Sequence, residues 1–212
     1  MNAQLEKILI PEPPEDLLDI NHGLNRFLPA PELNEFLEAT VLDDRHFLFN
    51  EEHIHLLKAT IGFLWTNAPN KKQMKRIVGT AEIPFFRGNG WQKARQEQQL
   101  DEWFGIQPDF LITFDAENWA ESSAAQKLYV FEHELSHCAQ AVNAFGMPRF
   151  SRMTGKPIFS MRGHDVELFT SQVRRYGIQA AGQDAIDLVA AASATPLIAS
   201  AKIDAMCGTC VN

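Results

Sequence analysis

The sequence predicts an α+β fold in which a small, mostly antiparallel sheet packs against one long helix, with further helices toward both ends of the chain. Two apolar segments with the alternation typical of strands, 76–86 and 109–114, predict the sheet. The long helix is predicted over 121–145, where apolar residues recur at steps of three and four before Gly146 and Pro148. With 212 residues, of which 45% are hydrophobic and 22% charged, the chain fits one domain.

This single domain, residues 1–212, is expected to have three parts. An N-terminal arm and a helix occupy 1–70, a core follows over 71–180, and a helical extension and tail occupy 181–212. Five of the eleven prolines lie in 11–31, which predicts an extended or loop-like arm with short helical turns.

The first helix is predicted over 51–65. Its buried stripe would contain Ile54, Leu57, Ile61 and Leu64, and its first turn is acidic. His53 and His55 lie two residues apart and therefore on different sides of a helix, so we expect packing or solvent-facing roles for them rather than joint metal binding.

The core is expected to contain the two strands, joined by a segment at 91–103 that is either a polar helix or a long solvent-facing loop. The first strand, 76–86, is interrupted at Gly79 and Pro84. Short alternating runs on both sides of Thr154 and Gly155 predict a β-hairpin over 149–162, which would join the same sheet.

The last part of the chain is expected to contain a helix over 184–194 and a tail with the pattern C-x-x-C at Cys207 and Cys210. This pattern is half of a zinc knuckle without its second half, and a redox motif without its strand–helix setting. We therefore expect an inert tail, and three cysteines in all do not form a disulfide framework.

The predicted helix over 121–145 carries the pattern H-E-x-x-H. Residues four apart lie on one face of a helix, so His133 and His137 can bind one Zn²⁺. Glu134 stands one step round the helix, where its carboxylate can act as general base on a Zn-activated water without ligating the metal. Composition alone would produce this pattern in roughly two of a hundred such chains, so a chance match is rare. The place of the pattern on an amphipathic helix further favours a metal site.

A catalytic zinc ion needs a third protein ligand and an open position. His164 and Glu167 lie three apart at the start of another predicted helix, for which Asp165 suits the N-cap. Either His164 or Glu167 could turn toward the first two histidines, and spacing does not choose between them. A histidine in a turn before a helix also needs no metal to explain it.

Four stretches of the sequence can be compared with known zinc proteases: H-E-L-S-H at 133–137, K-P at 156–157, G-H-D-V-E-L-F at 163–169 and R-R-Y-G at 174–177. Together they resemble the phage metallopeptidase family and, more distantly, SprT-like zinc proteases. The resemblance covers about residues 109–177. It implies a zincin-like fold, His164 rather than Glu167 as the third zinc ligand beside His133 and His137, and Glu134 as the base.

The resemblance also gives roles to two neighbouring elements. In zinc proteases of this type, the strand before the active-site helix borders the cleft and can pair with an extended peptide substrate, which here assigns that role to 109–114. The hairpin over 149–162 is then a candidate substrate lid.

The charge and hydropathy of the sequence limit the kinds of partner that we expect the protein to bind. A formal charge of −8 and a pI near 5.3 argue against a broad grip on nucleic acid, which depends on Lys and Arg. The start of the sequence lacks the basic and apolar regions of a signal peptide, and no run approaches the ~18 apolar residues of a membrane span. We expect a cytoplasmic protein, in a host cytoplasm if it is phage-encoded, with a peptide or protein substrate and no membrane partner.

The sequence therefore favours a zinc metallopeptidase with its catalytic core in 71–180. Two alternatives stay open. One is a non-catalytic binding or adaptor protein with a structural zinc site, against which Glu134 argues because a structural site needs no base. The other is a SprT-like protease acting on DNA-associated proteins, which the acidic balance disfavours.

Overall fold

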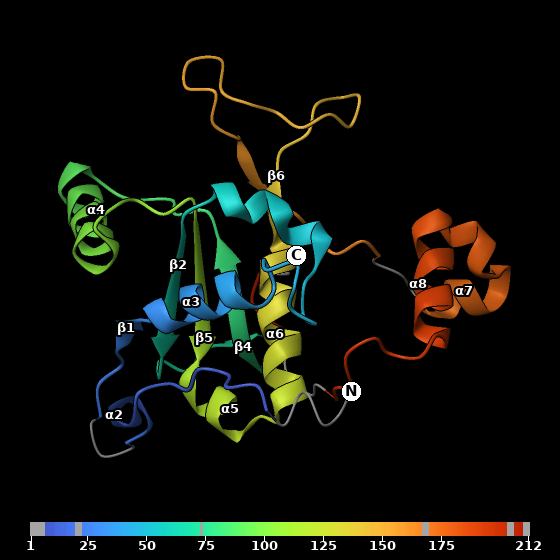
Figure 1. Ribbon diagram of the computed structural model, residues 1–212, viewed down its shortest axis with the longest axis horizontal. Helices are drawn as coiled ribbons and strands as arrows, with labels where there is room; N and C mark the ends of the chain where they lie inside the picture. Colours follow the sequence, from blue (N-terminus) through green and yellow to red (C-terminus); the bar gives the residue numbers. More distant parts are fainter. Residues whose placement is uncertain (1–6, 20–22, 73, 167–169, 203–205, 210–212) are drawn as a thin grey trace.

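One mixed sheet organises the computed structural model, which describes residues 7–19, 23–72, 74–166, 170–202 and 206–209 (Figure 1). Within these residues the sheet has six strands: β1 (Phe27–Pro29), β2 (Ile61–Thr66), β3 (Lys71–Lys72), β4 (Lys75–Glu82), β5 (Phe110–Asp115) and β8 (Met206–Cys207). The strand order is β1-β2-β5-β4, and β3 and β8 both pair with β4.

The sheet is mixed, so the expectation of a mostly antiparallel sheet is corrected. β2 runs parallel to β5, and β8 runs parallel to β4, whereas the other pairs are antiparallel. A parallel pair needs a long crossover, which the segment between β2 and β5 supplies. The strands predicted over 76–86 and 109–114 are both present as β4 and β5, and β4 ends before Pro84.

The predicted helix over 51–65 is wrong in its second half. A 3-10 helix, η2 (Glu51–Lys58), is followed by β2, whose six residues are all buried. A strand covered on both faces reads as a continuous apolar run, and such a short run cannot be distinguished from a buried helix by periodicity. Gly62 marks the close packing here, because a Cβ on it would lie 2.8 Å from the Phe104 ring.

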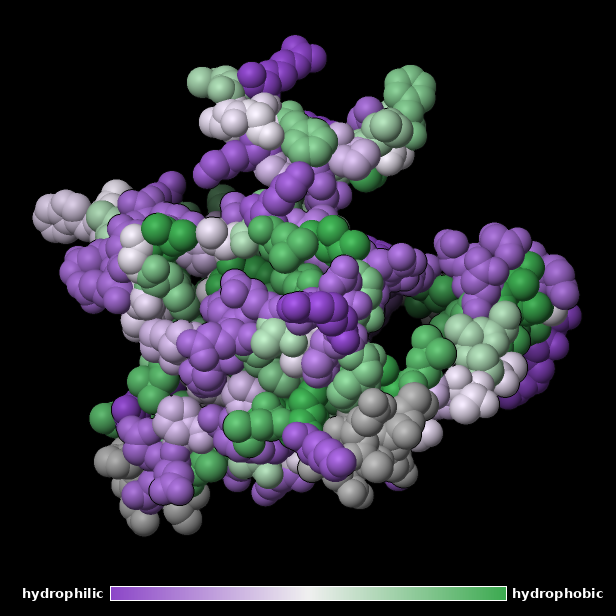
Figure 2. All heavy atoms as spheres, in the orientation of Figure 1, coloured by the Kyte–Doolittle hydropathy of each residue, from purple (hydrophilic) through white to green (hydrophobic). Residues whose placement is uncertain are grey.

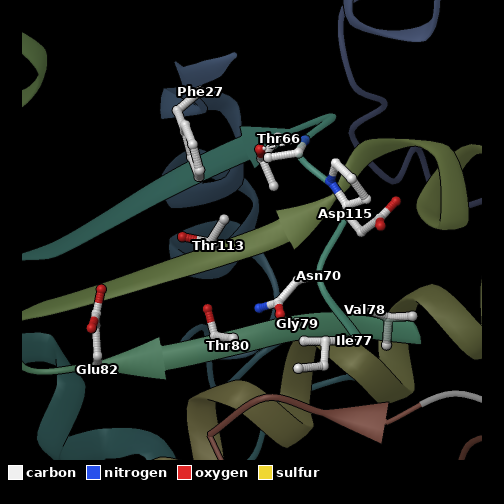
Figure 3. Close-up of a pocket in the computed structure, with 12 residues that line it drawn as sticks. Phe27, Thr66, Asn70, Ile77, Val78, Gly79, Thr80, Glu82, Thr113 and Asp115 are labelled. Atoms are coloured by element: carbon white, nitrogen blue, oxygen red, sulfur yellow. Dashed lines mark hydrogen bonds between the residues drawn. The ribbon is translucent and has the colours of Figure 1, made fainter. Parts of the chain in front are cut away.

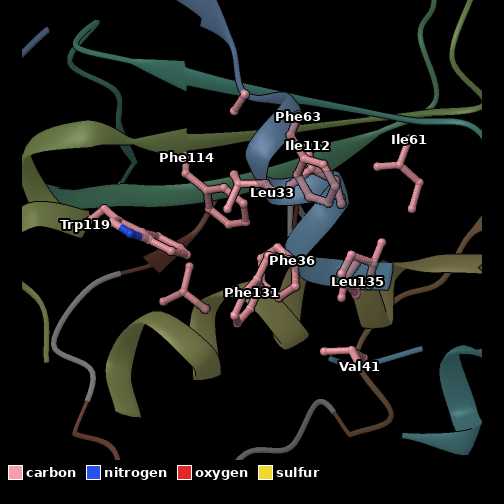
Figure 4. Close-up of a cluster of buried hydrophobic side chains, with 14 of the residues drawn as sticks. Leu33, Phe36, Val41, Ile61, Phe63, Ile112, Phe114, Trp119, Phe131 and Leu135 are labelled. Carbon is pink, nitrogen blue, oxygen red and sulfur yellow. The ribbon is translucent and has the colours of Figure 1, made fainter. Parts of the chain in front are cut away.

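Three helices cover one face of the sheet: α3 (Pro31–Ala39), α5 (Ala116–Glu121) and α6 (Ala124–His137). Aromatic rings fill the space between them and the strands, with Phe131 of α6 at the centre (Figure 4). Its ring lies 5.5 Å from that of Phe36 in α3 and 5.6 Å from that of Phe63 in β2. This packing fixes α6 against the sheet. The sequence did not predict α3, which has Pro31 at its start.

The opposite face of the sheet is covered in part by α4 (Gly90–Phe104). Leu100 packs there against Leu64 and Leu111. A capping box between Asn89 and Gln92 begins the helix, which decides between the helix and loop predicted for 91–103. An open cavity of about 310 Å³ lies at the sheet as well, lined by residues of β1, β2, β4 and β5 (Figure 3).

The N-terminal arm has the expected extended character, with a short helix, α2 (Glu15–Leu18), and β1 at the sheet edge. The Trp119 indole N–H donates to the carbonyl of Pro11, 2.9 Å away, and ties the arm to α5.

The helix predicted over 121–145 ends at His137, eight residues early. The chain continues as β6 (Cys138–Gln140), which pairs with β7 (Phe159–Met161) in a separate two-stranded sheet. The predicted hairpin therefore does not join the main sheet, although Phe150 and Pro157 do face each other across its turn. Residues 142–157 project from the body (Figure 1).

A group of three helices lies beside the body, at the right of Figure 1: α7 (Thr170–Tyr176), η3 (Ile178–Ala181) and α8 (Gln183–Ser193). The helix predicted over 184–194 is thus present as α8. Among the described residues, no helix has the length and apolar character needed to cross a membrane.

Candidate metal centre

Helix α6 presents the H-E-x-x-H residues. Its N-terminus is capped by Ser123, whose hydroxyl and backbone exchange hydrogen bonds with Gln126. Phe131 and Leu135 are completely buried on the side that faces the core. His137 is the last residue of the helix, so the motif lies where α6 meets β6.

The structure brings together the three histidines singled out from the sequence. The Nε2 atom of His133 lies 3.3 Å from Nε2 of His137 and 3.3 Å from Nε2 of His164. A tetrahedral Zn²⁺ with Zn–N distances of about 2.0–2.1 Å separates its ligand nitrogens by about 3.3–3.4 Å. The imidazoles thus stand at the spacing of zinc ligands.

The alternative third ligand, Glu167, lies outside the described residues, as does the helix start that Asp165 was expected to cap. The Asp165 carboxylate pairs with the guanidinium of Arg162 instead. His164 is in an irregular segment between β7 and α7.

A backbone carbonyl orients His137. Nδ1 of His137 lies 2.7 Å from the carbonyl oxygen of Arg162, which can only accept, so Nδ1 carries the proton and Nε2 presents its lone pair. The Arg162 N–H donates in return to the carbonyl of His137, 2.8 Å away. Arg162, the residue after β7, therefore sets the tautomer of His137, a contact across the hairpin that no sequence pattern indicated.

Glu134 is the most confined polar residue of the site. Its side chain is 1% exposed, Oε2 accepts a hydrogen bond of 2.9 Å from the Thr209 hydroxyl, and Oε1 has no partner among the described residues. Burial raises the pKa of its carboxyl to about 8, and the neighbouring Cys207 adds to the rise. A buried carboxylate oxygen without a partner is costly unless a cation or a reacting group satisfies it.

Gly79 of β4 makes the room that Glu134 occupies. A Cβ built on Gly79 would lie 2.8 Å from Oε1 and 2.9 Å from Cγ of Glu134. In the sequence this glycine indicated only an interruption of the strand, because nothing local shows what a missing side chain accommodates.

Cys207 also lies in the site, which contradicts the expected inert tail. Its Sγ is 3.4 Å from Nε2 of His137, and the ligand atoms of His133, His137 and Cys207 all lie within 4.8 Å of one another. For His137, burial opposes protonation, but contacts with Cys207, the Arg162 carbonyl and Glu134 outweigh it and raise the pKa of the imidazole. The C-x-x-C pattern was the only signal in the sequence, and Cys210 lies outside the described residues.

The centre opens into a cleft of about 870 Å³ between α6 and α8. Tyr129, His133 and His137 line one side, and Asp187 and Leu188 line the other. Figure 2 shows the hollow between the α7–α8 helices and the body. The cleft is large enough for a peptide segment to approach the histidines.

The side chains present fit a metal ion such as Zn²⁺. Imidazole nitrogens and a thiol are the donors that Zn²⁺ prefers, and each of the three separations given above is close to that of two ligands on one tetrahedral ion. The partnerless Oε1 of Glu134 lies beside this donor set on the same helix.

The α+β fold and this donor set define a candidate metalloprotein. The chain belongs to the phage metallopeptidase family: the family described as "Putative phage metallopeptidase" matches residues 26–193. The match runs from just before β1 to the end of α8, well beyond the stretch 109–177 that carries the sequence resemblance. No curated protein and no solved structure matches the chain.

Proposed function

We propose that the protein is a zinc metallopeptidase in which His133, His137 and His164 hold Zn²⁺ and Glu134 is the general base. The observation that carries this proposal is that Nε2 of His133 lies 3.3 Å from Nε2 of both His137 and His164, beside a buried carboxylate. Membership of the phage metallopeptidase family supports it.

The metal ligands, Glu134 and the Arg162 carbonyl would have separate roles in peptide hydrolysis. A bound Zn²⁺ would supply a Lewis acid that polarises the peptide carbonyl and lowers the pKa of the attacking water. Oε1 of Glu134 accepts the proton of that water as its oxygen adds to the carbonyl carbon, and Glu134 returns the proton to the nitrogen as the C–N bond breaks. The Arg162 carbonyl holds a proton on Nδ1 of His137, so that Nε2 is the nitrogen directed at the metal.

Glu134 must be ionised to act as a base. Its burial favours the neutral acid and raises its pKa. A divalent cation held by the two flanking imidazoles favours the carboxylate, because opposite charge at short distance stabilises the ionised form. Metal binding and base ionisation are thus coupled in this site.

One observation favours a second candidate function. Cys207 offers a fourth protein donor, and four protein ligands are the mark of a structural zinc site. The protein would then be a binding or adaptor protein, with the cleft serving a partner. Glu134 argues against this candidate. A buried carboxylate oxygen without a partner among the described residues costs stability, and a structural zinc site has no use for a base that would offset this cost.

The two candidates are separated by metal analysis and cleavage of fluorogenic casein. Wild type and Glu134→Gln are compared, each with and without Cys207→Ala, so that a thiol at the fourth position cannot mask activity. We expect zinc in every sample and cleavage lost with Glu134→Gln. Glu132→Gln is the matched control, since Glu132 is its neighbour on α6 and bonds to Asn50. Zinc without cleavage in all forms would establish the adaptor.

A further inference from the structure

The segment around β8 lies on the edge of β4 opposite β5, next to β3 and to the metal centre. The register pairs Met206 with Ile77 and Cys207 with Gly79, and the Gly208 N–H donates to the Gly79 carbonyl, 2.8 Å away. Figure 3 shows the reddish ribbon of β8 alongside β4 at Ile77 and Val78. β8 therefore occupies an edge to which another extended peptide could add.

This edge, and not that of 109–114, is the one available to a substrate. β5 is paired with β2 on one side and with β4 on the other, so it has no free edge and the role expected for it is wrong. β4 lies directly against Glu134 through Gly79. A peptide that added to β4 as a strand would thus pass the base, along the path that β8 takes.

Cys207 and Thr209 both face the centre. The Cys207 sulfur lies 3.4 Å from Nε2 of His137, and the Thr209 hydroxyl donates to Oε2 of Glu134, 2.9 Å away. One side chain therefore lies at the metal ligands and the other at the base.

Gly208, between them, allows the close approach. A Cβ on Gly208 would lie 2.3 Å from Cγ2 of Thr80 and 2.7 Å from Cγ2 of Ile77, both on stiff β-branched side chains. Each residue of the sequence Cys-Gly-Thr thus fits this position: Cys207 supplies a ligand atom, Gly208 lets the backbone approach β4, and Thr209 supplies a hydroxyl for Glu134.

We propose that β8 is an autoinhibitory strand: the Cys207 thiolate takes the fourth ligand position of the metal, and the Thr209 hydroxyl holds the base. This proposal rests on the proposed protease function. With Zn–S of about 2.3 Å and Zn–N of about 2.0–2.1 Å, a tetrahedral site separates sulfur from nitrogen by about 3.5 Å, close to the distance present here. The protease is latent until β8 leaves β4.

Two features make β8 displaceable. Its strand is two residues long, with further hydrogen bonds to β4 only from Gly208 and Thr209 among the described residues, and Cys207 is partly exposed. The family match ends at residue 193, before β8, so the matched range contains the three histidines and Glu134 without Cys207. A protein substrate or a protein that captures the β8 segment would open the fourth position and the edge of β4 together.

The ligand assignment is tested without any activity, by replacing the metal with Co²⁺ and recording the absorption spectrum. A thiolate ligand gives an intense near-ultraviolet charge-transfer band. We expect this band in the wild type and its loss in Cys207→Ala. Cys138→Ala and Cys210→Ser are the matched controls and should retain it. A band that survives Cys207→Ala, or that disappears in Cys210→Ser, overturns the assignment.

Latency is tested with zinc-loaded protein and fluorogenic casein. Cys207→Ala removes the ligand, whereas Gly208→Val displaces the strand but keeps both Cys207 and Thr209. We expect cleavage to rise at least about tenfold in each, because a tethered segment competes at an effective concentration on the order of millimolar. Adding Glu134→Gln to Gly208→Val should abolish the gain. Circular dichroism verifies that both variants are folded.

The outcomes separate the two proposals. Loss of the cobalt band with equal cleavage by wild type and both variants overturns latency and leaves the protease intact. Loss of the band with no cleavage in any form overturns the protease and latency together, and makes Cys207 the fourth ligand of a structural site.

Discussion

Gly79 and Glu134 show how closely the site depends on single atoms. Because β5 and β8 hold the backbone of Gly79 on both sides, a methyl group there cannot move away from Glu134. In the Cys207→Ala background, where the fourth metal position is open, we expect Gly79→Ala to shift the carboxylate and reduce cleavage by about 10²-fold, the cost of a misplaced catalytic group, while zinc is retained. Gly90→Ala is the control, since nothing lies within 4 Å of its added Cβ. Unchanged cleavage in Gly79→Ala would show that Glu134 is not the base.

The third ligand is tested by ranking His164 against Glu167 in a zinc titration with a competing chromophoric chelator. Nε2 of His164 already stands 3.3 Å from that of His133, so His164→Ala should abolish tight zinc binding. Glu167→Ala should weaken affinity or activity by only about 10- to 100-fold, as the loss of a carboxylate that orients a ligand does. The reverse ranking would make Glu167 the ligand.

His53 predicts a pH dependence of stability that does not involve the metal. It is 2% exposed, its Nε2 has no partner among the described residues, and burial, with His55 and Arg162 adding to it, lowers its pKa from 6.5 to about 4. Between pH 6.5 and 4 the unfolded chain binds more protons, so stability falls as the pH falls.

The loss over this window is at most about 3 kcal/mol, from 1.36 kcal/mol per pKa unit. It is measured by urea denaturation at several pH values with a chelator present, so that proton-coupled release of the metal does not contribute. His53→Gln should flatten the dependence between pH 6.5 and 4. Equal slopes in both proteins would contradict the assignment.

At the scale of elements, the β6–β7 pair positions His137 through the Arg162 carbonyl, whereas residues 142–157 project away from it. We expect that replacing 142–157 with Asn-Gly, which suits a two-residue hairpin turn between Ala141 and Ile158, leaves one zinc per chain. Metal analysis and thermal melting measure this. Loss of zinc would show that the projecting loop, and not β7 alone, orders the site. Cleavage by the same variant tests whether the loop is a substrate lid.

The elements that the sequence predicted correctly are those whose own residues carry the signal. β4 and β5 alternate, and α8 has a helical composition, whereas 91–103 was left open between a helix and a loop. β2 was mistaken for a helix because its burial on both faces comes from α3 on one side and α4 on the other. α6 stops at His137 because β7 draws the following residues into a strand pair, which periodicity within 121–145 does not reveal.

At the scale of the whole molecule, the site likewise contains residues that a local sequence pattern identified and groups that only distant segments supply. His133, Glu134 and His137 were identifiable because a helix brings neighbours in sequence together. The groups that complete the centre come from distant segments: the Arg162 carbonyl, the space at Gly79, and Cys207 and Thr209 on β8. Only the tertiary fold places these groups beside α6, so no local pattern could predict them.

X-ray absorption at the zinc edge tests the central claim most directly, because it reports the atoms bound to the metal. For the zinc-loaded wild type we predict three nitrogen ligands at about 2.0–2.1 Å and one sulfur at about 2.3 Å. In Cys207→Ala the sulfur should be replaced by oxygen or nitrogen while the three imidazoles remain. A wild-type spectrum with fewer than three imidazoles would contradict the metal centre, and one without sulfur would contradict its closure by β8.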